Sequence, residues 1–319
     1  METMIINRLM YDTVNFWIDR VNFSGGNPFD ILPCLSEISE RHNEKSGYSA
    51  SGKVFDYTVN VFENGISMKG SLSKSFFESE NISTLTRRAT EQTIEKLSDS
   101  LYFDVSKAKV TRLDVSTVIP TKRPPCDYYQ FLGTKTHFKR LEAVKDETLY
   151  YSNHQRQIIF YDKTKEANSK AVKVPELLQN INLFRYELRF LKRVNAQFKA
   201  DVTAKTLYDE MFYQSVVQNW YKEYQSIQKL KNQSFMIDGI TTPKEAQTAL
   251  FSHLLQQSGQ STIDEFLNEL KAKNVFSDRK YYSRLKADLN RILAQPKGEP
   301  SELMQELETA IYNVAKYAR

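Results

Sequence analysis

Two segments of the chain carry a carboxylate next to arginines at a spacing of two residues. In residues 110–116 the pair is Arg112 and Asp114, and in residues 183–190 Glu187 lies between Arg185 and Arg189. Successive side chains of a strand point to opposite faces, so at this spacing the charged groups share one face and the apolar residues share the other. Carboxylate oxygens are ligands that divalent cations prefer. The pattern therefore predicts a metal site on one face of a sheet.

A third segment, residues 156–163, ends an apolar run with Tyr161, Asp162 and Lys163. A bound divalent metal polarises a phosphodiester, and a tyrosine hydroxyl can attack it. Lys163 stands two residues after Tyr161 and is expected on the same strand face, where it can lower the pKa of the phenol or hold a phosphate oxygen. The three segments are compatible with metal-assisted attack of Tyr161 on a phosphodiester, although the pattern alone favours Tyr161 as a residue that packs in the sheet.

Other residues near these segments are candidates for the remaining contacts. His154, Asp162 and water are candidates for the further metal ligands, although the sequence favours His154 as an ordinary polar loop residue. Asp114 and Glu187 have a structural alternative as buried ion-pair partners of the neighbouring arginines. Tyrosines in strands are often packing residues. The side chains expected to contact DNA phosphates or stack on bases are Arg112, Arg156, Arg185, Arg189 and Tyr151.

Composition restricts the class of protein. The chain has 319 residues, enough for one large or two medium domains, and 40% of them are hydrophobic. No apolar run approaches the length of a membrane span, and the two cysteines and four histidines argue against a disulfide framework and a zinc site. A reducing, cytoplasmic setting without membrane contact is expected. The net charge of +5 favours nucleic acid only mildly.

The hydrophobic periodicity predicts an α+β fold. Strands are expected around a hairpin turn at Asn64-Gly65, followed by a helix over residues 83–101 with Ser83 as its N-cap. Residues 1–200 are predicted to form an α+β catalytic domain around an antiparallel sheet, and residues 201–319 a helical region. The boundary is left open, because a helix starting near Val202 can also pack on the sheet.

The helical region is expected to contain helices over residues 202–231, 244–257, 262–273, 279–293 and 302–318. Residues 262–293 are compatible with a helix-turn-helix that binds duplex DNA, because the second helix is basic. A solvated helix of a bundle explains the same pattern equally well.

The three segments in this order resemble the replication initiators of filamentous phages (the gene II type) and of rolling-circle plasmids. The matching pieces are an Arg-hydrophobic-Asp strand, an apolar strand that ends in Tyr-Asp-Lys, and an Arg-x-Glu strand. The hairpin, the sequence from Gly70 onward and the helix after it are similar in order and spacing. The resemblance covers roughly residues 10–225.

This resemblance implies a nicking domain related to the HUH-type endonuclease fold. By position, Tyr161 would attack the origin phosphodiester and become joined to the 5′-phosphate, leaving a 3′-OH primer, and the displaced strand would later be rejoined. Asp114 and Glu187 would hold Mg²⁺ or Mn²⁺. The implied partners are single-stranded or hairpin origin DNA and a helicase and polymerase of a bacterial host, and a homodimer is left open.

Two departures from the family patterns limit the metal assignment. Many plasmid initiators carry a second acid four residues after the first, where this chain has Val118. A histidine-hydrophobe-histidine strand does not occur either. The alternative functions are a conjugative relaxase or single-strand transposase with the same chemistry, and a DNA-binding replication protein without enzymatic activity.

Overall fold

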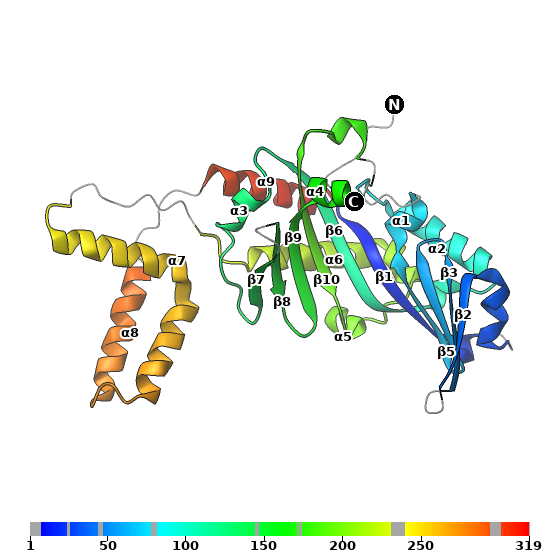
Figure 1. Ribbon diagram of the computed structural model, residues 1–319, viewed down its shortest axis with the longest axis horizontal. Helices are drawn as coiled ribbons and strands as arrows, with labels where there is room; N and C mark the ends of the chain where they lie inside the picture. The colour runs from blue at the N-terminus through cyan, green and yellow to red at the C-terminus, as the bar shows by residue number, and fades with distance from the viewer. Residues whose placement is uncertain are drawn as a thin grey trace.

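The computed structural model describes residues 8–23, 26–43, 47–77, 82–143, 147–170, 172, 174–230, 240–293 and 301–318. Its centre is a 10-stranded sheet in the order β2-β3-β4-β5-β1-β6-β10-β9-β8-β7, and every neighbouring pair is antiparallel (Figure 1). The strands are β1 (Met10–Asp19), β2 (Ser36–Asn43), β3 (Gly47–Val54), β4 (Tyr57–Phe62), β5 (Gly65–Ser71), β6 (Lys109–Thr121), β7 (Lys139–Ala143), β8 (Thr148–Ser152), β9 (Arg156–Asp162) and β10 (Asn182–Phe190). The large antiparallel sheet and the helices that follow it confirm the predicted α+β class.

The α-helices lie between the strands and after the last of them. Short 3₁₀ turns connect several of the elements. The α-helices are α1 (Leu72–Phe76), α2 (Arg87–Leu101), α3 (Cys126–Tyr129), α4 (Lys163–Ser169), α5 (Val194–Phe198), α6 (Glu210–Gln225), α7 (Pro243–Ala272), α8 (Arg279–Leu293) and α9 (Glu302–Tyr317).

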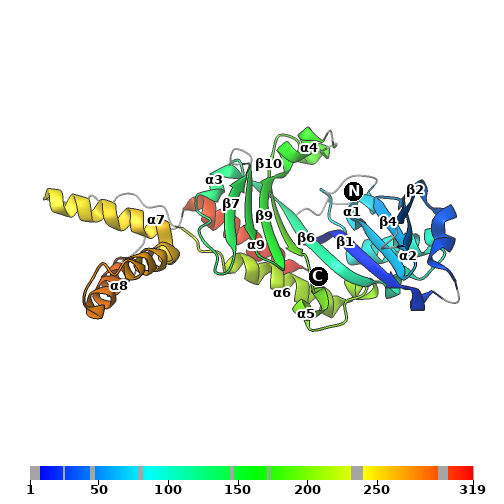
Figure 2. The same ribbon diagram turned by 60° about the horizontal axis from the view of Figure 1, so that its bottom comes forward.

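One face of the sheet carries the main hydrophobic core. Helices α2, α6 and α9 contribute buried apolar side chains to the same cluster as the strands. Figure 2 shows α6 and α9 running behind strands β6, β9 and β10. Tyr186 of β10 stacks on Trp220 of α6 with ring centroids 4.6 Å apart, and its hydroxyl donates a 2.8 Å hydrogen bond to the Trp220 carbonyl. Aromatic pairs of this kind add to the stabilisation from area burial. Helices from beyond residue 200 therefore belong to the core of the sheet.

Helices α7 and α8 form a separate arm. They pack against each other around Ile263, Leu267 and Leu289, and Figure 1 shows the pair standing away from the sheet. Residues 244–257 and 262–273, predicted as two helices, are one continuous helix in α7. The intervening residues include a glycine but no proline, and a single glycine costs only about 1 kcal/mol inside a helix.

Two local predictions had different outcomes. The Asn64-Gly65 turn joins β4 to β5 as predicted, and Gly65 is required there because its φ is +155° and an added Cβ would lie 2.2 Å from the Ile18 carbonyl oxygen. The predicted N-cap Ser83 is wrong. Helix α2 begins after Thr86, whose side chain accepts a 3.1 Å hydrogen bond from the Ala89 amide. Within the described ranges, no helix has both the length and the apolar character needed to cross a membrane.

Candidate active-site cleft

The strand order brings the three predicted segments together. Strand β10 lies between β6 and β9, so Arg189 pairs with Asp114 on one side, and Arg185 pairs with Tyr161 on the other. Glu187 stands between the two arginines on the same strand face. Residues that are far apart in the sequence thus share one face of three adjacent strands, opposite the hydrophobic core.

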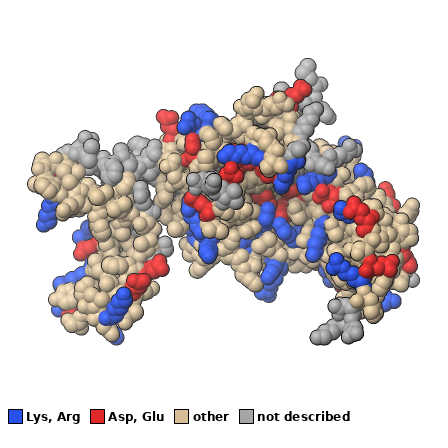
Figure 3. Space-filling view, viewed as in Figure 1, with Lys and Arg blue, Asp and Glu red and all other residues tan. Residues whose placement is uncertain are grey.

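A cleft of about 380 Å³ opens on this face. Helix α1 supplies Lys74 to its rim, and α4 with the residue that follows it supplies Glu166 and Lys170. Figure 3 shows acidic and basic side chains mixed over this central region. The residues that line it come from β1, β5, β6, β9, β10 and the segments next to them: Asp12, Thr13, Asn15, Asp56, Lys69, Gly70, Ser71, Lys74, Arg112, Tyr161, Glu166, Lys170, Glu187 and Arg189.

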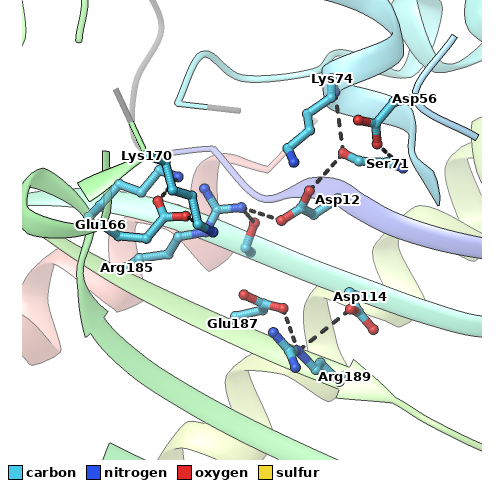
Figure 4. Close-up of polar contacts among 12 residues, drawn as sticks. Asp12, Asp56, Ser71, Lys74, Asp114, Glu166, Lys170, Arg185, Glu187 and Arg189 are labelled. Atoms are coloured by element: carbon cyan, nitrogen blue, oxygen red, sulfur yellow. Dashed lines mark hydrogen bonds and ion pairs between the residues drawn. The ribbon is translucent and has the colours of Figure 1, made fainter. Parts of the chain in front are cut away.

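Both predicted metal-binding carboxylates are buried and paired with arginine. Asp114 is 1% exposed and accepts two hydrogen bonds from Arg112, at 2.9 Å from Nε and 2.6 Å from Nη2. Arg189 Nε lies 2.6 Å from Glu187 Oε1 and 3.6 Å from Asp114 Oδ2, and therefore links the two acids (Figure 4). Burial raises the pKa of Asp114 to about 7, although Arg112 opposes this shift.

Asp12 on β1 is a site residue that the sequence prediction missed. Its Oδ2 accepts a 2.6 Å hydrogen bond from Arg185 Nη2, and its Oδ1 accepts a 2.9 Å bond from the Ser71 hydroxyl (Figure 4). Arg185 is fully buried and also donates to Ser116 Oγ at 2.8 Å. Burial acts to raise the pKa of Asp12, but Arg185 and Ser71 outweigh it and the pKa is lowered. The only sequence signal was an acid within an otherwise β-forming segment.

Tyr161 faces the cleft beside Arg185. The Arg185 guanidinium carbon lies 6.0 Å from the centre of the Tyr161 ring. Burial raises the pKa of the phenol well above its ordinary value, while the positive charge of Arg185 acts in the opposite direction. The phenol is therefore neutral near pH 7 in this arrangement. A reaction at its oxygen requires the proton to leave as the new bond forms.

Lys163 is the first residue of α4, because the strand ends at Asp162. The Asp162 side chain caps this helix by accepting a 3.0 Å bond from the Lys165 amide. The Lys163 side chain is 1% exposed, and its Nζ lies 2.5 Å from Oε2 of Glu166, a residue that lines the cleft. Burial, assisted by the charge of Arg185, lowers the pKa of Lys163 to about 8.

Three predicted site residues lie elsewhere. His154 is in the turn between β8 and β9. Arg156 bonds to Gln197 and Glu223, and its guanidinium carbon lies 5.3 Å from the centre of the Phe190 ring.

Tyr151 is fully buried in the core. Its hydroxyl donates to the carbonyls of Leu132 at 2.9 Å and Gly133 at 2.7 Å. Its neighbour Tyr150 pairs with Ile159, which pairs with Glu187, so Tyr150 is the tyrosine on the cleft face.

Two comparisons with known proteins complete these observations. A family model for the N-terminal part of the gene II-type replication-associated protein matches residues 10–223, which include every strand of the sheet. The chain belongs to this family. The match confirms the resemblance to the gene II type of phage initiators and makes the chain a replication-associated protein. Among curated proteins, no relative matches the chain.

Proposed function

We propose that this protein of the gene II family nicks one strand at a replication origin through Tyr161. The phenol oxygen bonds to phosphorus, the bond to the 3′ oxygen breaks, and the phenol proton is lost as the 3′ oxygen gains one. The products are a 5′-phosphotyrosine linkage and a free 3′-OH primer, and the reverse reaction rejoins the displaced strand. The supporting observation is that Tyr161 lines the same cleft as Glu187, Arg189 and Asp12.

The cation Arg185 favours the reaction at Tyr161, whereas burial and the nearby carboxylates of Glu187, Asp12 and Glu166 raise the pKa of the phenol. A phosphodiester repels an anionic nucleophile, and the phenolate is favoured by a fixed cation at the distance of Arg185. Lys69, Lys74 and Lys170 line the cleft and offer contacts for phosphate oxygens on either side of the scissile bond. Arg112 and Arg189 are engaged with carboxylates, so their first role is to orient those acids.

Mg²⁺ or Mn²⁺ is part of this proposal, with Asp114 and Glu187 as the residues that would hold it. The donor chemistry fits, because both are buried carboxylates on adjacent strands. Glu187 lines the cleft, Asp114 lies beneath its lining residue Arg112, and the buried Asn15 amide oxygen, in the cleft that Glu187 lines, has no hydrogen-bond partner in the described part of the chain. When bound, the ion would stabilise negative charge on the phosphodiester.

The arginine pairs set a condition on metal binding. Across the described ranges, no three His, Cys, Asp or Glu side chains are grouped to hold a metal ion. Asp114 and Glu187 are bonded to Arg112 and Arg189, with which a metal ion has to compete. His154 lies in the turn between β8 and β9 and has no part in the proposed chemistry.

The proposed partner in the cleft is single-stranded or hairpin origin DNA, and the free 3′-OH would be used by a host polymerase and helicase. The decisive test is incubation of the full chain with labelled single-stranded origin DNA and Mg²⁺ or Mn²⁺, followed by denaturing electrophoresis and peptide mass spectrometry. We expect a covalent adduct at Tyr161 that disappears in EDTA.

Tyr161→Phe should abolish the adduct while DNA affinity remains. Tyr150→Phe is the matched control, because Tyr150 lies on the same face of the neighbouring strand. DNA that is bound by the wild type but never cut would replace the enzymatic proposal with that of a DNA-binding replication protein.

A further inference from the structure

The arm formed by α7 and α8 has a basic part that runs from the last turn of α7 through α8, whereas the acidic residues Glu245, Asp264, Glu265 and Glu269 precede it. Residues 270–291 contain seven lysines and arginines against two aspartates, a net charge of +5, which equals the net charge of all 319 residues. The family match ends at residue 223, before this arm begins. The arm is also unnecessary for covering the sheet, since its small core consists of its own side chains. The positive charge of residues 270–291 is therefore not explained by a role in stabilising the sheet domain.

The end of the arm contains a cavity of about 640 Å³ between the two helices. Lys271 and Asn274 come from the end of α7 and its turn, whereas Arg279, Ser283 and Lys286 come from α8. Ser277 adds a further hydroxyl, and no carboxylate is among the residues that line the cavity. Ammonium, guanidinium, amide and hydroxyl groups can all donate hydrogen bonds to phosphate oxygens.

The outer face of α8 extends this basic surface. Lys280, Arg284 and Arg291 are separated by four and seven residues, which places them on one side of a helix that turns about 100° per residue. The buried side chains Tyr282 and Leu289 lie on the opposite side. The three cations span about 16 Å at a rise of 1.5 Å per residue.

These cations are available for a partner. In the described part of the arm, no acidic group is within ion-pair distance of Lys271, Arg279 or Arg284. Lys280, Lys286 and Arg291 are paired with Asp278, Asp264 and Asp288, but all these side chains are well exposed. Exposed pairs of this kind contribute about 1 kcal/mol or less, so a phosphate can displace them.

We propose that the α7–α8 arm binds the phosphate backbone of duplex DNA, separately from the cleft that holds the strand to be cut. A single exposed helix with cations along its outer face matches the dimensions of the major groove, roughly 12 Å wide, with phosphates on both edges. The cavity would hold a phosphate of one strand. The inference rests on the proposed function for the choice of origin DNA as the partner, and it adds a second contact that positions the duplex beside the nicking site.

The test compares two triple variants of the full chain. Lys271→Gln with Arg279→Gln and Arg284→Gln removes three exposed cations of the arm. Lys96→Gln with Lys107→Gln and Lys205→Gln removes three exposed lysines from α2 and the 3₁₀ turns that contact it, and serves as the matched control. The probe is a labelled 20-base-pair duplex, titrated at several salt concentrations, and circular dichroism verifies that helix content is unchanged.

We expect the arm variant to bind the duplex at least tenfold more weakly near 0.1 M salt. The slope of log affinity against log salt should fall by about 2 to 3, since each phosphate contact contributes roughly 0.9. The control variant should keep the wild-type affinity and slope. Unchanged duplex affinity in the arm variant overturns the proposal, as does tighter binding of a double-stranded RNA of the same sequence by the arm.

Adduct formation on a short single-stranded oligonucleotide separates this inference from the proposed function. The arm variant should form the adduct within about twofold of the wild-type rate. If the wild type forms no adduct but binds duplex through the arm, only the nicking proposal fails. If the adduct forms and the arm variant binds duplex normally, only the arm proposal fails.

Discussion

Asp12 and Arg185 are 173 positions apart in the sequence, yet the carboxylate of one and the guanidinium of the other are joined by a 2.6 Å hydrogen bond below the cleft. The pair ties β1, near the start of the chain, to β10, and it places a fixed cation beside Tyr161. The bond is therefore both a tertiary restraint and a source of the electrostatic field at the proposed nucleophile.

Removing the charge of Asp12 should destabilise the fold. Asp12→Asn leaves the Arg185 guanidinium buried without its counter-ion, and loss of one partner of a buried pair costs roughly 3–5 kcal/mol. We expect a loss of that order in the free energy of unfolding, measured by urea denaturation. Asp19→Asn is the control, because its partner Lys109 is half exposed, and it should cost about 1 kcal/mol or less. Equal losses in both variants would contradict the role of the buried pair.

The depressed pKa of Lys163 predicts a pH dependence of stability. Between its folded pKa of about 8 and an unfolded value of about 10.4, the unfolded chain binds the additional proton, so this group makes the protein more stable as the pH rises through that window. Relative to Lys163→Met, the free energy of unfolding of the wild type should increase by roughly 3 kcal/mol between about pH 7.5 and 10.5. Unfolding by urea at a series of pH values measures the difference.

Lys165→Met is the control for this series, because Lys165 is exposed on the same helix. The increase with pH in the free energy of unfolding should be much larger relative to Lys163→Met than relative to Lys165→Met. An equal increase relative to both variants would mean that the Lys163 amine is not penalised by burial.

Tyr151→Phe should affect stability and leave DNA binding unchanged. The substitution removes hydrogen bonds to two buried carbonyls, which is worth about 1–2 kcal/mol. Tyr150→Phe should have little effect on stability, since Tyr150 is half-buried on the cleft face. Thermal denaturation and a DNA titration on both variants measure this. A loss of DNA affinity in Tyr151→Phe, with normal stability, would restore the predicted DNA contact.

The metal proposal predicts a matched loss of activity in two variants. Asp114→Asn and Glu187→Gln keep the size of each side chain but remove the charge that attracts a divalent ion. We expect each to lower metal-dependent adduct formation at least ~100-fold at a fixed Mg²⁺ or Mn²⁺ concentration, and higher metal concentrations should restore part of the rate. Asp127→Asn, on an exposed ion pair with Arg123, is the control and should behave as wild type. Wild-type rates in both variants would remove the metal from the proposal.

The arrangement of charges on single strands could be predicted from the sequence. A strand alternates its side chains between two faces, so the spacing of Arg112 and Asp114 is sufficient to place them together. The turn at Asn64-Gly65 could also be predicted, because Asn-Gly is a strong hairpin signal. Glycine tolerates the backbone conformation that this turn requires. The prediction of where α2 begins was wrong because several residues with hydroxyl groups precede the helix. Any of them could be the N-cap by sequence, and the backbone conformation makes it Thr86.

What lay beyond the sequence was the order of the strands and the face each one turns to the core. Adjacent strand residues such as Tyr150 and Tyr151 point to opposite faces of a sheet, but the sequence does not say which face is the core. The hydrogen bonds of Tyr151 to the carbonyls of Leu132 and Gly133 lie in the buried side of the fold. Strand β1 pairs with β6, which pairs with β10 on its other side. This strand order brings Asp12 within hydrogen-bond distance of Arg185. Local periodicity is a property of a few residues, whereas strand order is selected by burial of the whole apolar surface, which no short segment contains.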